Sequence, residues 1–245
     1  MGYFTDEEVI HFKENGFVRK HGVVDRPLLD KAVDKFYEEI GVDRDKPESF
    51  INAGRGGNLK VSSDPDVRAT LTESPLQEMC AELAGDELKV QNYTFAKPVF
   101  PTGRPESEWA HPAHGHLDGY NLPGVVDTFT VAVTVNMNDI KPKSGGFTVW
   151  PGTHKRAHEY FREHSIVNGL EAFKDREGNY VDLPEPVENP GPPGTVVFWH
   201  NLIMHQAGKN HGKEIRMACV SRFCRRNLDD IKFEFSEDMW QHWAI

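Results

Sequence analysis

The run HPAHGHLDGYN, residues 111–121, concentrates residue types that bind metal ions. Besides His111 and His114, which we interpret as rim residues, it holds His116 and Asp118 two positions apart. On a strand or strand edge, residues two apart project from the same face. With one more histidine, this pair could meet an octahedral Fe(II) and leave three positions open. A bare H-x-D is common by chance, so a solvated loop is the alternative interpretation.

The third metal ligand must come from another part of the chain. The candidates are His154, His158, His164, His200, His205 and His211. His205 follows the apolar, strand-like GTVVFWHNLIM, which predicts that its side chain lies inside the fold. His211 in KNHGK and His154 in PGTHK have contexts typical of turns. Burial therefore favours His205.

A second strand-like run, EIRMACVSRF, carries two arginines on one face, Arg216 and Arg222. An inward-pointing guanidinium is costly unless it meets an anion, and a carboxylate gripped in a bidentate fork would satisfy it. Arg216 lies eleven residues after His205, and Arg222 lies eleven after His211. The spacing therefore does not choose between them, and a surface ion pair is the alternative for either.

The elements before about residue 87 have helical patterns. FTDEEVIHFKENGFV opens with a capping box formed by Thr5 and Glu8, and Gly16 can end the helix. A second helix is predicted in DRPLLDKAVDKFYEEIG and a third over 75–85.

From about residue 88 the periodicity changes to that of strands. LKVQNYTFAKP, VDTFTVAVTVNM, GGFTVWPG, GTVVFWHN and EIRMACVSRF are rich in β-branched and aromatic residues. They predict a barrel or jelly roll over about 88–225. A polar insertion over about 154–193 could cap its mouth, and a tail covers 226–245. No repeat or linker divides the chain, so one domain is expected over 1–245.

Composition restricts the partners. The 245 residues carry a net charge of −10 with no basic stripe, which argues against nucleic acid. The longest apolar runs are strand-length, which argues against a membrane span. There is no signal-peptide pattern, and the three cysteines form no CxxC motif, so a cytoplasmic protein acting on a small molecule is expected. The oligomeric state is left open.

Several of these runs, in order, resemble the phytanoyl-CoA dioxygenase family of Fe(II)/2-oxoglutarate oxygenases. FTDEEVIHFKENGFV looks like the family's opening helix and first strand, and VQNYTFAKP like the strand before its metal motif. HLDG looks like its H-x-D-G, and SGGFTVWPGTHK like its Gly-rich strand. GTVVFWHNLIMHQAG and IRMACVSRF resemble its distal histidine and arginine strands. The resemblance implies a double-stranded β-helix, a mainly β jelly roll with N-terminal helices packed outside.

The resemblance also implies which residues bind the cofactors. His116, Asp118 and His205 correspond to the iron ligands, and Arg216 to the anchor for the distal carboxylate of 2-oxoglutarate. The implied reaction uses O2 to convert 2-oxoglutarate to succinate and CO2 and hydroxylates an unactivated C–H bond. Because Asp118 is present where halogenating relatives carry Gly or Ala, hydroxylation is favoured, although desaturation and ring closure use the same ligands.

Two further cosubstrate contacts follow from the resemblance. Gln91 falls where related enzymes carry a polar contact to cosubstrate or substrate. Ala207 stands where family members often have a serine that holds 2-oxoglutarate, and Thr134 is the residue expected to substitute. Two hypotheses from other classes remain. One is a catalytically silent ligand-binding jelly roll. The other is a zinc hydrolase with the same ligands, although no obvious general-base glutamate lies beside the histidines.

Overall fold

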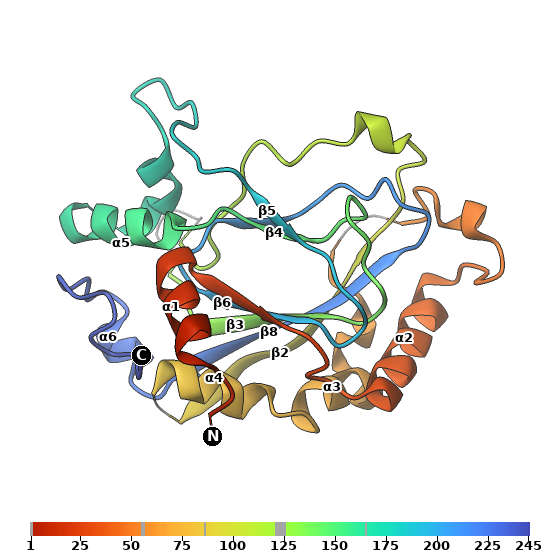
Figure 1. Ribbon diagram of the computed structural model, residues 1–245, viewed down its shortest axis with the longest axis horizontal. Coiled ribbons are helices and arrows are strands. Elements are labelled where there is room, and N and C mark those ends of the chain that lie inside the picture. The colour runs from red at the N-terminus through yellow and green to blue at the C-terminus, as the bar shows by residue number, and fades with distance from the viewer. Residues whose placement is uncertain (1, 55–56, 86, 121–125, 165) are drawn as a thin grey trace.

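Two antiparallel sheets face each other in the computed structural model, which describes residues 2–54, 57–85, 87–120, 126–164 and 166–245, without the side chains of 91–93 and 166–168 (Figure 1). The major sheet has the order β1 (Phe17–Lys20), β6 (Val196–His200), β3 (Val131–Asn136), β8 (Arg216–Arg225) and β2 (Leu88–Val99). The minor sheet has the order β5 (Val187–Asn189), β4 (Phe147–Val149) and β7 (His205–Ala207). The predicted jelly roll is confirmed, but its two sheets do not close into a barrel.

Helices cover the outer face of the major sheet (Figure 1). The N-terminal helices are α1 (Asp6–Asn15), α2 (Arg26–Ile40), α3 (Pro65–Thr72) and α4 (Leu76–Ala84), with the short turns η1 (Pro47–Phe50) and η2 (Lys60–Ser63). The later ones are η3 (Glu106–Glu108), α5 (Thr153–Glu163), η4 (Ile166–Phe173) and α6 (Leu228–Ile231). The three predicted helices correspond to α1, α2 and α4, whereas α3 was not predicted.

Alternation along the strands separates two apolar clusters. In β3, Val131, Val133 and Val135 pack with the helices, whereas Ala132 belongs to the cluster between the sheets. The same alternation in β8 turns Val220 inward. Side chains on the inner face of the major sheet are therefore the ones available to a site between the two sheets.

The segments predicted as insertion and tail both pack against the core. Within 154–193, β5 pairs with β4, so this segment contributes a strand to the minor sheet. In the tail, the Trp243 ring stacks on His200 with 5.0 Å between centroids, and Trp240 lies 6.0 Å from Phe12. The tail thus packs on the fold. None of the helices in the described ranges is long and apolar enough to cross a bilayer.

Candidate metal centre

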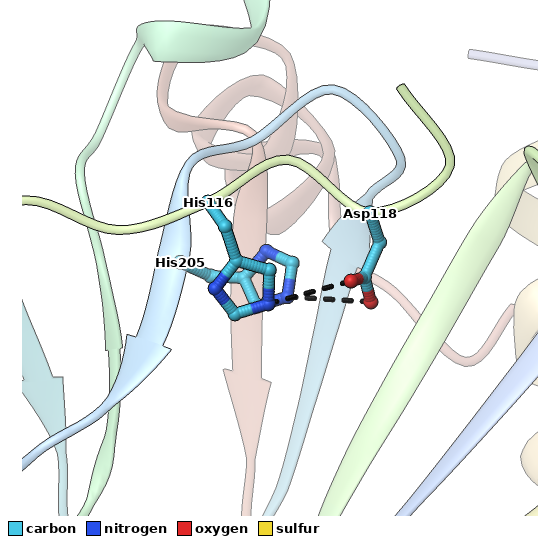
Figure 2. A group of neighbouring side chains, drawn as sticks. All are labelled: His116, Asp118 and His205. Atoms are coloured by element: carbon cyan, nitrogen blue, oxygen red, sulfur yellow. Dashed lines mark ion pairs between the residues drawn. The ribbon is translucent and has the colours of Figure 1, made fainter. Parts of the chain in front are cut away.

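His116, Asp118 and His205 converge, with one potential ligand atom from each lying within 4.8 Å of the others (Figure 2). The Nε2 atom of His116 is 3.3 Å from Asp118 Oδ1, and Nε2 of His205 is 3.5 Å from Asp118 Oδ2. Two imidazoles and a carboxylate facing one point are a donor set suited to a divalent transition metal. The three residues predicted from the sequence are thus brought together.

Backbone pairing holds the two histidines side by side. His116 and His205 form a bridge in which each amide N–H donates to the other's carbonyl, at 3.0 and 3.1 Å. Gly115 makes this approach possible, since a Cβ atom there would lie 2.5 Å from the His205 carbonyl oxygen. The segment carrying His116 is therefore fixed against β7 before any metal binds.

The residues around Asp118 direct its carboxylate toward the histidines. Leu117 between the two ligands is fully buried in a separate apolar cluster with Tyr120 and Phe161, so its neighbours point the other way. Gly119 adopts a φ of 83° directly after Asp118, a left-handed conformation that favours glycine. The strand-edge alternation expected for H-x-D is present.

The protonation states also suit a metal. Burial alone would raise the pKa of Asp118, but His205, His116 and Arg222 together lower it well below its ordinary value. Burial lowers the pKa of His205 against the attraction of Asp118, so its imidazole favours the neutral form. Its Nδ1 lies 3.0 Å from the Ile203 carbonyl, which leaves Nε2 toward Asp118.

These ligands open into a cavity of about 500 Å³ between the sheets. Its apolar walls come from Phe95, Phe147, Trp199 and Val220. Gln206 and Ala207 also line it, next to His205. The cavity is large enough for a small molecule beside a metal ion.

Both arginines of β8 line this cavity, although at different places. Arg216 is 3% exposed, its Nε makes no hydrogen bond within the described chain, and its Nη1 lies 3.4 Å from the Lys97 carbonyl. Burial lowers the pKa of Arg216 to about 10. Arg222 instead pairs with Asp118. Of the two, Arg216 is the buried cation without a carboxylate partner among the described residues.

The other predicted cosubstrate contacts have different outcomes. The side chain of Gln91 lies outside the described residues. Thr134 is fully buried, and its hydroxyl accepts a hydrogen bond of 3.1 Å from the Trp199 indole. The described lining of the cavity includes Trp199 but not Thr134, so Thr134 lies behind the indole.

The remaining histidines lie away from the ligand atoms. His111 is exposed beside Trp109, and His114 stacks on Tyr180 with 4.0 Å between ring centroids. The prediction that His154 lies in a turn is wrong. Gly152 ends the turn, α5 begins at the next residue, and His154 is fully buried.

Lys97 lines the cavity, and the sequence leaves two interpretations for it, a contact to an anionic substrate or solvated surface, of which the second is favoured. On its own it is interpreted as solvated surface, as most lysines are. The signal that could have found it is register, because Lys97 pairs with Ala218 on the strand that carries both arginines.

A family model for phytanoyl-CoA dioxygenase (PhyH) matches residues 12–218. The peroxisomal phytanoyl-CoA dioxygenase of Bos taurus is 28% identical over 128 residues, which are 51% of this chain and 36% of the relative. The human enzyme is 29% identical over 117 residues, 46% of this chain and 33% of the relative. The match thus spans about a third of the length of these relatives.

The fold is also similar to that of solved structures of non-haem α-ketoglutarate-dependent enzymes. The non-haem α-ketoglutarate-dependent carbocyclase SnoK from nogalamycin biosynthesis has a TM-score of 0.64 at 20% identity, covering 91% of this chain and 85% of that one. With a family match that runs from residue 12 to residue 218, the chain belongs to the phytanoyl-CoA dioxygenase family.

Proposed function

We propose that this chain is an Fe(II)/2-oxoglutarate-dependent dioxygenase that hydroxylates an unactivated C–H bond of a small molecule and releases succinate and CO2. The observation that carries the proposal is one cavity containing both a His–Asp–His metal site and a buried arginine without a carboxylate partner in the described chain. The cofactors of the proposed reaction are Fe(II), 2-oxoglutarate and O2.

In this proposal His116, Asp118 and His205 hold Fe(II), which when bound supplies the activation of O2. Arg216 binds the distal carboxylate of 2-oxoglutarate, because a desolvated guanidinium gains most from a bidentate anion. The other residues position these groups and exclude water. The Ile203 carbonyl orients the His205 ring.

The remaining predicted contacts stay within the proposal. Gln91 is proposed as a polar contact to cosubstrate or substrate. Thr134 is proposed to act through Trp199, whose indole it holds in the wall of the cavity. A cytoplasmic location is also proposed, supported by the free thiols of Cys80, Cys219 and Cys224.

The test is anaerobic addition of Fe(II) and then 2-oxoglutarate to metal-free protein, with the visible charge-transfer band recorded. We expect a band in the native chain, none in His116→Ala and at least tenfold weaker 2-oxoglutarate binding in Arg216→Ala. His111→Ala and Arg226→Ala are matched controls, because both side chains are exposed and outside the cavity lining.

Native protein that binds iron without forming the band would contradict the cosubstrate assignment. Succinate release that requires a second substrate would separate a dioxygenase from a silent binding protein and from a zinc hydrolase. Product analysis would then separate hydroxylation from desaturation or ring closure.

A further inference from the structure

The cavity has a charge composition opposite to that of the chain. The sequence has 38 acidic and 28 basic residues. The described lining of the cavity nevertheless contains three cations, Lys97, Arg216 and Arg222, and one carboxylate, Asp118. Such a concentration of like charge in a partly desolvated space is unfavourable without anions to balance it.

The proposed cofactors would not remove this surplus. Fe(II) adds two positive charges and 2-oxoglutarate two negative ones, so two uncompensated positive charges remain in the cavity. If Arg216 holds the distal carboxylate, the surplus belongs to Arg222 and Lys97. This step rests on the proposed function, because it counts those two cofactors as present.

Arg222 is too far along β8 to share the anion of Arg216. They are six positions apart in the strand, so at about 3.3 Å per residue their Cα atoms are about 20 Å apart. The Arg222 guanidinium instead reaches Asp118, on the metal side of the cavity. Its Nε is buried and has no hydrogen-bond partner in the described part of the chain.

Lys97 and Arg222 lie near the same aromatic ring. Its Nζ lies 5.9 Å from the centroid of the Phe95 ring, and the Arg222 guanidinium carbon lies 5.8 Å from the same ring. Both cations therefore lie within 6 Å of the centre of one phenyl ring. Within the described residues, no carboxylate pairs with Lys97. Desolvation, together with Arg222 and Arg216, lowers the pKa of the Lys97 amine against the attraction of Asp118.

We propose that Arg222 and Lys97 form a second anion site beside the metal ligands, which binds a carboxylate or phosphate group of the substrate. Arg222 is held between Phe95 and Phe129, whose ring centroid is 5.0 Å from its guanidinium carbon, so its orientation is fixed. One guanidinium nitrogen stays on Asp118, and the remaining donors, with the lysine ammonium, bind the anion. The substrate class is therefore an anionic small molecule, oriented with its charged group near the iron ligands.

The test measures anion binding to the anaerobic Fe(II)/2-oxoglutarate complex by calorimetry, at constant ionic strength set with chloride. Acetate and methyl phosphate are the probes. We expect binding of at least one probe, weakened at least tenfold by Lys97→Met and by Arg222→Gln, and less by Arg222→Lys. Tighter binding of methyl phosphate than of acetate would identify a phosphate ester, and comparable binding a carboxylate.

Two controls carry the same substitutions outside the cavity lining. Lys89 lies on β2, and Arg226 directly follows β8. The Lys89→Met and Arg226→Gln variants should both bind the probes with affinities within twofold of that of the native protein. Native protein that binds neither probe would overturn the proposal. Lys97→Met and Arg222→Gln variants that bind the probes as tightly as the native chain would also overturn it. Loss of probe binding in Arg222→Gln alone would overturn it too, because Arg222 would then only support Asp118.

The charge-transfer band of Fe(II) and 2-oxoglutarate is recorded on every sample. If the native protein shows no band, the proposed function is contradicted, whether or not the probes bind. If the native protein shows the band but binds neither probe, only the proposed anion site is contradicted.

Discussion

At the scale of single residues, the proposed metal site depends on the small size of Gly115. A Cβ atom there would meet the backbone oxygen of His205 at 2.5 Å, and backbone cannot move aside as a flexible side chain can. Gly115→Ala should therefore separate His116 from β7 and lower Fe(II) affinity at least tenfold, measured by competition with a chelator. Gly208→Ala, at the other end of β7, is the control because its nearest contact would be an ordinary 3.4 Å. Equal affinities in the two variants would contradict this account of the bridge.

The grouping of His116, Asp118 and His205 was predictable, because the face on which a strand residue lies and its burial both follow from short local runs of sequence. His116 and Asp118 are two apart in a strand-edge segment, and His205 follows an apolar run. The choice between Arg216 and Arg222 was not predictable from spacing, since both lie on the inner face of β8. Only the position of Asp118 across the cavity separates their environments.

At the scale of elements, α1 meets α5 where Gly16 ends the first helix. Gly16 and Gly41 both end helices in the left-handed conformation, at φ 81° and 73°. A Cβ atom at Gly16 would lie 2.6 Å from Nδ1 of His154 in α5, whereas one at Gly41 meets nothing within 4 Å.

Alanine at either glycine should therefore lower the free energy of unfolding by about 1–2 kcal/mol through backbone strain. Gly16→Ala should lose about 1–3 kcal/mol more through overpacking against His154. Denaturant unfolding of the two variants measures the difference. Equal losses in the two variants would mean that the contact between α1 and α5 adjusts to the added methyl group without loss of stability.

Element boundaries were less predictable than the site. The capping box at Thr5 and Glu8 is present in α1, because capping is a local interaction. The eight-residue α3 is too short to establish a periodicity, and its stability comes from packing with α2 and β2. The start of α5 was missed because Pro151 and Gly152 look like the centre of a turn rather than the start of a helix.

At the scale of the whole molecule, buried histidines link stability to pH. Burial lowers the pKa of His154 to about 4 and that of His200 well below its ordinary value. In the unfolded chain these two histidines bind protons as the pH falls through about 6.5, whereas in the folded chain they stay neutral. Their contribution to the free energy of unfolding is therefore fully present above pH 6.5 and is lost as the pH falls toward 4.

Each such group contributes a slope of at most about 1.4 kcal/mol per pH unit in the free energy of unfolding. His154→Gln should therefore flatten the dependence measured between pH 4.5 and 6.5, even if the variant is less stable at pH 7. The exposed His164→Gln should leave the slope unchanged. A His154→Gln variant with the native slope would show that other groups govern the acid sensitivity.

The bridge between His116 and His205 has one more consequence. In the described minor sheet, β7 is one of the two outer strands, and outer strands offer unpaired backbone groups to other chains. The segment that carries His116 occupies two of those groups, the N–H and the carbonyl of His205. The contact that brings the proposed metal ligands together therefore also shields part of this edge from adding a strand of another molecule, so loss of this segment from β7 would favour aggregation as well as weaker metal binding.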